Sequence, residues 1–165
     1  MDYATLRNYP AAIADLDRAI ALTPDFALAY FQRGVARAEE AAASGSSQES
    51  GASNSSPLLG GVQGTPAALD LRMAISDFDQ AAKLSPQLAF AHYNKANALV
   101  QLGDLTSALS AYRRAIEIKP DFGEAYYNLA YVYFQLGNRA EGSANLSKAG
   151  ELGVVPSYNL LKRMH

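Results

Sequence analysis

The sequence AFAHYNKANALVQLGDLTSALSAYRRAIEIKPDF at residues 89–122 decides the fold. Residues 123–156, GEAYYNLAYVYFQLGNRAEGSANLSKAGELGVVP, repeat its pattern. The residues that recur 34 positions apart are Asn94 and Asn128, Gly103 and Gly137, Pro86 and Pro120, and Ala81, Ala115 and Ala149. A fixed period of this length is typical of helical hairpins that stack on one another. Each hairpin then buries its apolar face against the next one.

Composition narrows the class of function. The chain has 165 residues and 49% of them are hydrophobic, which is enough for a continuous core between stacked helices. A net charge of −2 gives no basic surface for nucleic acid, so we expect no nucleic-acid partner. No apolar run approaches the ~20 residues that span a bilayer, so membrane insertion is not expected either. The absence of cysteine excludes disulfides and thiolate metal sites.

The third unit carries the residue pattern of a known family. Its small residues are Ala96, Ala108 and Ala115, a large Tyr112 lies beside them, and Pro120 closes the unit. This pattern resembles the tetratricopeptide repeat (TPR) family, and in particular bacterial members of it. The resemblance implies an all-α fold, a right-handed α-solenoid of antiparallel helix pairs with about three and a half units. It also implies a helical repeat scaffold for protein-protein interaction.

The repeat pattern predicts one TPR domain over residues 1–165. We expect a partial first repeat at 1–26, a second at 27–88, a third at 89–122, a fourth at 123–156 and a C-terminal capping segment at 157–165. The first repeat lacks most of its helix A, which suggests a fragment of a longer array. In the fourth repeat Val154 replaces the closing proline, which suggests that the regular array ends there.

The second repeat contains an insertion. Ala12, Leu16, Ala19 and Pro24 reappear as Ala74, Phe78, Ala81 and Pro86, each 62 positions later, which is one period plus 28 residues. The Ser/Gly-rich text at about 43–64 is predicted to be a flexible loop between helix A (about 27–42) and helix B. Thr65 and Pro66 are suited to the N-cap and first turn of helix B, so this helix is expected to start near Pro66.

In tetratricopeptide arrays the A helices usually carry the ligand. By resemblance, the outward-facing A-helix positions are predicted to bind a peptide or partner protein. They are Phe31, Gln32, Val35 and Glu39 in the second repeat, Phe90, Tyr93, Asn94, Asn97 and Gln101 in the third, and Glu124, Tyr127, Asn128, Tyr131 and Gln135 in the fourth. Amides both donate and accept hydrogen bonds, and tyrosines provide rigid contact area. An alternative is that the two asparagines bond locally and the tyrosines pack under neighbouring helices.

Several other signals are weak. Family members that bind chaperone tails use a clamp of Lys, Arg and Asn. In this chain Phe90 and Asn94 occupy positions where that clamp has basic residues, so a chaperone-clamp role is not expected. The glycine-rich run at 60–65 lacks the Gly-Lys-Ser/Thr ending of a phosphate loop. Two isolated histidines make no metal site. The carboxylate pairs Asp15/Asp17 and Asp77/Asp79 diverge on a helix and are predicted to be solvated. We therefore expect no enzyme, no cofactor and no metal.

A second hypothesis is a self-associating structural scaffold. The apolar side of the first B helix, Ile13, Leu16 and Ile20, lacks most of its partner helix in the first repeat. Such an edge favours a homodimer or a segment swap, with the long loop as a hinge. A third possibility is an accessory domain of an enzyme. The N-terminus does not read as a signal peptide, so the localisation is open: cytoplasmic if the chain is complete, exported if it is a fragment.

Overall fold

A computed structural model describes residues 8–46 and 64–154. All regular elements in these two ranges are α-helices, seven in number. They are α1 (Tyr9–Leu22), α2 (Ala27–Ser46), α3 (Pro66–Leu84), α4 (Ala89–Gln101), α5 (Leu105–Ile118), α6 (Gly123–Gln135) and α7 (Arg139–Glu151). Residues 1–7, 47–63 and 155–165 lie outside the description. The predicted capping segment, most of the insertion and the remnant of the first helix A therefore lie there.

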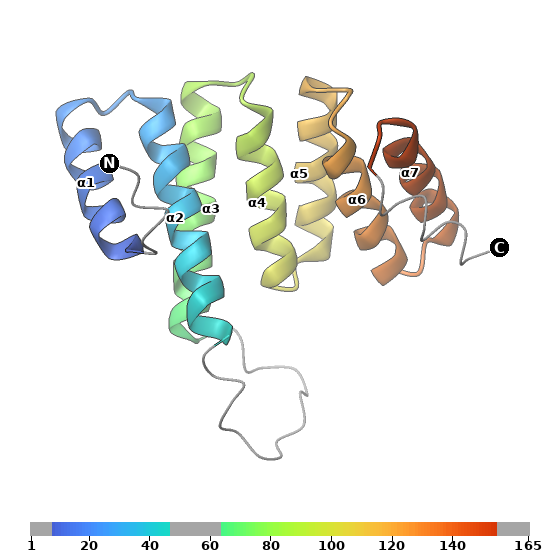
Figure 1. Ribbon diagram of the computed structural model, residues 1–165, viewed down its shortest axis with the longest axis horizontal. Coiled ribbons are helices and arrows are strands. Elements are labelled where there is room, and N and C mark those ends of the chain that lie inside the picture. Colours follow the sequence, from blue (N-terminus) through green and yellow to red (C-terminus); the bar gives the residue numbers. More distant parts are fainter. Residues whose placement is uncertain (1–7, 47–63, 155–165) are drawn as a thin grey trace, which may run out of the picture. The chain divides into compact units, whose positions relative to one another are not determined.

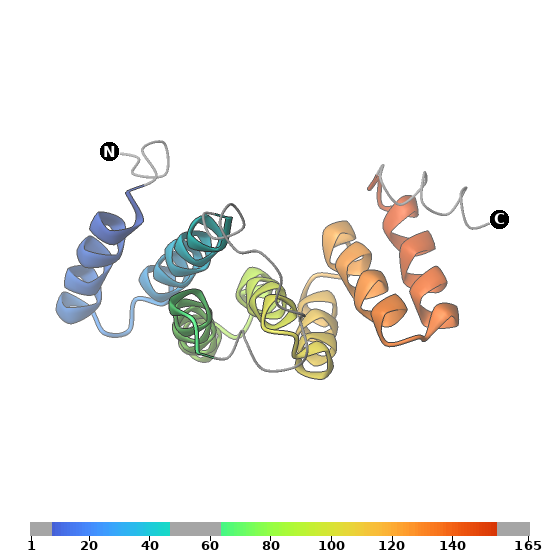
Figure 2. The same ribbon diagram turned by 90° about the horizontal axis from the view of Figure 1, so that it is seen from below.

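The chain divides into two compact units, Met1–Pro86 and Gln87–His165, which we describe separately. In the first unit, α2 packs against α1 and α3. In the second, α4 packs against α5, α5 against α6, and α6 against α7. Figures 1 and 2 show these neighbours side by side as hairpins of antiparallel helices. The predicted all-α fold of stacked helix pairs is confirmed, and α2, α4 and α6 begin where the repeat pattern places helix A.

Helix starts and turns follow local chemistry. The Asp104 and Asn138 side chains accept hydrogen bonds from the backbone N–H of Ser107 and Glu141, and thereby cap α5 and α7. Gly103 and Gly137 adopt φ values of 80° and 78° in the turns that precede these caps. This left-handed conformation favours glycine, which explains why a glycine recurs at this point of the repeat.

The core consists of small residues at helix crossings with larger ones between them. Ala74, Ala96 and Ala115 are fully buried, while Phe78 and Tyr112 are 1% and 2% exposed. Because the alanines let backbones approach closely, larger residues there would be overpacked. These residues occupy the buried places that the repeat pattern predicts.

Two expectations about the first unit are wrong. Leu22, Leu84, Ile118 and Leu152 recur near the ends of the B helices, which predicts that all four point into the core, but Leu22 is 85% exposed. Its counterpart Ile118 packs against a cluster that includes Ala89 and Phe122. By contrast, the helix that α1 contacts is α2, and no residue of α1 is buried. A hydrophobic residue at a helix end enters the core only where a neighbouring helix covers it.

The second wrong expectation concerns the end of helix A in the second repeat. It was expected near Ala42, whereas α2 continues to Ser46. α3 starts at Pro66, as predicted, with Thr65 accepting from the backbone N–H of Ala68. The hairpin of α2 and α3 is therefore longer than the others, as Figure 1 shows. Ala41 and Ala68 are 3% and 1% exposed. The start of the inserted sequence therefore extends α2 as far as Ser46, since alanine-rich sequence favours helix.

Candidate functional site

The predicted binding residues fall into two groups, one in each unit. On α2, Gln32 and Glu39 are exposed, and Phe31 and Val35 are half-buried. The Phe31 ring lies 5.9 Å from the Phe78 ring of α3. Phe31 therefore contributes mainly to the packing of its own hairpin.

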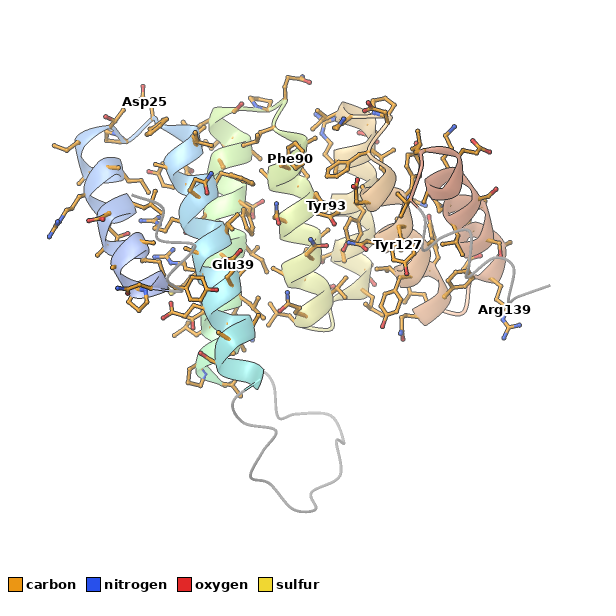
Figure 3. All side chains as sticks on the ribbon, viewed as in Figure 1. Asp25, Glu39, Phe90, Tyr93, Tyr127 and Arg139 are labelled. Atoms are coloured by element: carbon orange, nitrogen blue, oxygen red, sulfur yellow. The ribbon has the colours of Figure 1, made fainter. Side chains whose placement is uncertain are left out.

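The second group lies on α4 and α6 and includes the two most exposed aromatic residues of the predicted set. Phe90 is 46% exposed and Tyr131 is 52% exposed. Gln101, Glu124 and Gln135 are exposed too, while the other predicted residues of these helices are half-buried. We call the set Phe90, Asn94, Gln101, Glu124, Tyr127, Asn128, Tyr131 and Gln135 the α4–α6 face. Figure 3 labels Phe90 and Tyr93 on α4 and Tyr127 on α6.

A polar network under this face links three helices. The Asn128 side-chain amide donates to the Tyr93 hydroxyl and to Asn97 Oδ1, both at 3.1 Å. The Tyr112 hydroxyl of α5 donates to the same Asn97 oxygen at 2.5 Å. Burial raises the pKa of Tyr112, so its hydroxyl stays protonated and available as a donor. The network fixes α6 against α4 and α5.

The recurring asparagines have different partners although they share a repeat position. The Asn94 amide donates to its own helix, to the carbonyl of Phe90 at 2.9 Å. Asn128 instead joins the network between helices. The structure thus brings together Tyr93, Asn97 and Asn128, and it holds Asn94 by a local bond. The hydroxyl of Tyr112 was missed, because its repeat position marks it only as a core residue.

An aromatic cluster supports the start of α4. The Phe90 and Tyr93 rings lie 5.0 and 4.6 Å from the ring of Phe122, which is 4% exposed. Rings at such separations contribute favourable contacts beyond burial. The exposed edge of Phe90 is therefore held on a rigid base.

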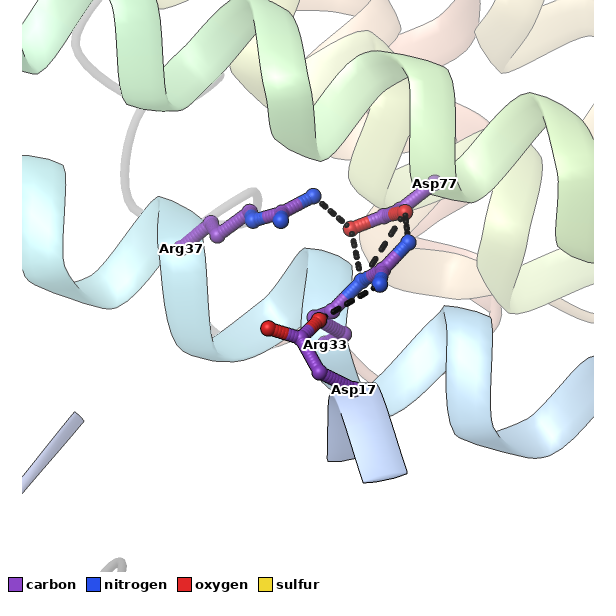
Figure 4. A network of polar contacts seen from close by, with 4 residues as sticks. All are labelled: Asp17, Arg33, Arg37 and Asp77. Atoms are coloured by element: carbon purple, nitrogen blue, oxygen red, sulfur yellow. Dashed lines mark hydrogen bonds and ion pairs between the residues drawn. The ribbon is translucent and has the colours of Figure 1, made fainter. Parts of the chain in front are cut away.

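One prediction about carboxylates is wrong. Asp77 was expected on a solvated face, yet it is 3% exposed. It accepts hydrogen bonds from Arg33 and Arg37 of α2, with shortest distances of 2.6 and 2.5 Å (Figure 4). Arg33 also bonds Asp17 of α1 at 2.6 Å, and its guanidinium lies 5.4 Å from the Tyr30 ring centre. The hydrogen bond to Asp77 raises the pKa of Arg33.

This cluster has a structural role. A buried carboxylate stays charged only if cations and hydrogen bonds surround it, and two arginines supply both. The sequence shows no basic residue within four positions of Asp77, and its partners lie 40 and 44 positions away on another helix. Arg33 and Arg37 are occupied by these pairs, so neither provides a free cation on α2.

A hollow of about 290 Å³ lies between α5, α6 and α7 in the second unit. Its lining residues are Arg113, Ile116, Glu117, Tyr126, Leu129, Tyr133, Glu141 and Asn145. The Arg113 guanidinium hydrogen-bonds the Tyr133 hydroxyl and lies 5.7 Å from its ring centre. None of the predicted binding residues lines this hollow.

Within residues 8–46 and 64–154, no helix is both long and apolar enough to span a bilayer. The same residues contain no cluster of three or more potential metal ligands from His, Cys, Asp and Glu.

Comparisons with known proteins identify the family of this fold. A TPR repeat model matches residues 3–39 and 96–137, and a tetratricopeptide repeat model matches 123–152. A crystal structure of MamA is similar with a TM-score of 0.74 and 17% identity, over 98% of this chain and 81% of that one. A MamA fragment from Desulfovibrio magneticus RS-1 is similar with a TM-score of 0.69 and 15% identity, over 91% of this chain and 69% of that one.

A further MamA structure gives a TM-score of 0.68 at 23% identity, over 91% of this chain and 67% of that one. At these identities the likeness concerns the fold alone. No curated protein sequence matches the chain. The matched models cover most of the helices described above, whose packing agrees with them. The chain therefore belongs to the tetratricopeptide repeat family, whose members are protein-protein interaction modules.

Proposed function

We propose that the chain is a non-catalytic interaction module that binds an extended segment of a partner protein on the α4–α6 face. The observation that carries the proposal is the stripe on α6 formed by Glu124, Asn128, Tyr131 and Gln135. These residues follow one another at intervals of three or four and so share one side of the helix. The stripe carries one carboxylate, two amides and the Tyr131 ring, so it offers a peptide both hydrogen-bonding groups for its backbone and an aromatic contact for a side chain.

Rigidity supports the same proposal. The stripe is fixed by the network through Asn97 and Tyr112, and Phe90 rests on Phe122. A face that is ordered before binding loses less entropy when a ligand is bound. We assign the protein no reaction, because the polar side chains under this face, Tyr93, Asn97, Tyr112 and Asn128, bond one another between helices.

The test is a selection of peptides from a random library displayed on phage, with the whole chain as bait. Peptides that bind are then titrated against the double variant Phe90→Ala/Tyr131→Ala. We expect at least about tenfold weaker binding, because exposed aromatic residues dominate interface energies. The matched control is Leu69→Ala/Met73→Ala on α3, where the two side chains are 57% and 39% exposed.

The control should bind as the unmodified chain does, and circular dichroism should show equal helicity in all three proteins. The proposal is wrong if no peptide is selected, or if the selected peptides bind the Phe90/Tyr131 variant unchanged.

A specific observation also favours self-association through the first unit. Leu22, Phe26 and Leu28 lie within seven positions of one another and are 85%, 46% and 48% exposed. Ile13, Leu16 and Ile20 of α1 are only half-buried. Exposed apolar clusters often mark contacts between proteins. Sedimentation velocity should show a concentration-dependent dimer that Leu22→Ser/Phe26→Ser abolishes; a monomer at all concentrations would exclude this function.

A further inference from the structure

We infer that the segment bound on the α4–α6 face is basic and presents arginine or lysine to it. This inference rests on the proposed function and adds the chemistry of the partner. It follows from which hydrogen-bonding groups of the face are already used, and from the charges that remain.

Three amide side chains of the face are oriented by hydrogen bonds that their NH₂ groups donate within the protein. The NH₂ group of Asn94 bonds the Phe90 carbonyl, which fixes the orientation of this amide because a carbonyl only accepts. The NH₂ group of Asn128 bonds Tyr93 and Asn97, and that of Gln135 bonds the Tyr131 hydroxyl at 2.8 Å. In each of these three residues the amide oxygen points away from the partner of its own NH₂ group. The face therefore offers acceptors to a ligand.

The charged residues of α4 and α6 also favour a basic ligand. α4 and α6 contain Glu124, Lys95 and His92 as their ionisable groups besides tyrosine. Lys95 and His92 line a different hollow, with Ser107 and Arg114 of α5. Only the Glu124 carboxylate belongs to the face, so the face is negatively charged. A guanidinium or ammonium group supplies donors alone together with the opposite charge.

The aromatic residues of the face complete a site for a cation. Phe90, Tyr127 and Tyr131 lie along it, and arginine favours aromatic rings at contact distance. The chain uses this contact twice internally, between Arg33 and Tyr30 at 5.4 Å and between Arg113 and Tyr133 at 5.7 Å. From Glu124 to Gln135 the α6 stripe extends about 16 Å, the length of about five extended residues. A short segment with one or two basic residues fits this length.

The peptides selected in the phage experiment test the inference. We expect arginine or lysine to be enriched in every family of peptides that depends on Phe90 and Tyr131. Glu124→Gln should weaken the binding of these peptides about two- to fivefold, which is the size expected for loss of an exposed ion pair. Asn94→Lys should weaken their binding on the order of tenfold, because the new lysine repels the basic residues of the peptide. Affinity should also fall with added salt.

The matched control is Glu151→Gln on α7, which removes another exposed carboxylate (62% exposed, paired with Lys148) outside the face. It should leave affinity unchanged. Face-dependent peptides that lack basic residues, or that are insensitive to Glu124→Gln and Asn94→Lys, would overturn the inference while the proposed function stands. If no face-dependent peptide is selected, both fail.

Discussion

Two helix triplets of this protein, α1–α2–α3 and α5–α6–α7, have the same repeat positions but join their helices by different chemistry. In the first, Arg33 and Arg37 of α2 meet the buried Asp77 of α3. In the second, the equivalent residues are Leu129 and Tyr133 of α6 and Asn145 of α7, and they line an open hollow.

The outer helices differ in the same way. Asp17 of α1 bonds Arg33, whereas the residue at its position in α5 is Arg113, which contacts Tyr133 instead. Aromatic residues are kept, since Tyr30 and Tyr126 are equivalent. The comparison teaches that the backbone of the repeat sets where the helices meet, while the residues at the contact are free to be ionic or apolar. Repeats tolerate this because each contacts mainly its neighbours.

The largest difference should appear on removal of the central acid. Asp77→Ala removes the carboxylate that Arg33 and Arg37 share, and their side chains are only 16% and 12% exposed. Loss of one partner of a buried pair costs about 3–5 kcal/mol. Asn145→Ala, its counterpart in α7, should cost less than about 1 kcal/mol, because its amide bonds only the exposed carbonyl of Glu141. Urea unfolding of both variants measures this; equal losses would show that the two triplets do not differ as argued.

A close approach of helices distinguishes the triplets next. A Cβ added at Gly34 would lie 2.7 Å from the ring of Phe78, which is 1% exposed and has no room to move. Gly34→Ala should therefore destabilise by about 1–3 kcal/mol. At Gly142 the Cβ would lie 2.6 Å from Phe134, which is only half-buried and free to shift. Gly142→Ala should cost less in the same unfolding assay, and the reverse order would contradict this account.

Exchange of the whole contact should have a smaller effect than removal of one member. The triple variant Arg33→Leu/Arg37→Tyr/Asp77→Asn gives α2 and α3 the residues of α6 and α7. We expect its stability to lie within about 1 kcal/mol of the unmodified chain, since buried ion pairs are often replaced without loss. Thermal and urea unfolding beside Asp77→Ala measure this. A triple variant as unstable as Asp77→Ala would mean that the ions are required for the packing itself.

The smallest effect concerns the caps of equivalent helices. α5 is capped by Asp104, whereas α7 has Asn138 at the same position. Hydrogen bonds from Ser107 lower the pKa of Asp104 below its ordinary value of 3.8. Its stabilising effect is therefore present above that value and is lost as the pH falls through the lower folded pKa. Asp104→Asn should change stability at pH 7 by less than about 0.5 kcal/mol.

The same substitution should make stability less dependent on pH between about 5 and 2. Unfolding curves across this range measure it, with Ser107 left in place. A dependence equal to that of the unmodified chain would show that this cap contributes nothing to acid sensitivity.

The sequence by itself determined the helical repeat. The period of 34 residues fixed the starts of α2, α4 and α6, and Thr65 with Pro66 fixed the start of α3. These features are local: a cap, a turn glycine or a small residue at a crossing acts within its own hairpin. The outward A-helix positions are also set by the repeat, although their binding role remains a prediction.

Only the tertiary structure decided which polar residues meet. Asp77 and Asp79 look alike in the sequence, but Arg33 and Arg37 approach Asp77 from another helix and make its burial possible. Asn94 and Asn128 occupy one repeat position, yet Tyr93 and Asn97 give the second a different set of bonds. The physical reason is that a side chain's hydrogen bonds and exposure depend on residues distant in the chain, which a repeat period does not specify.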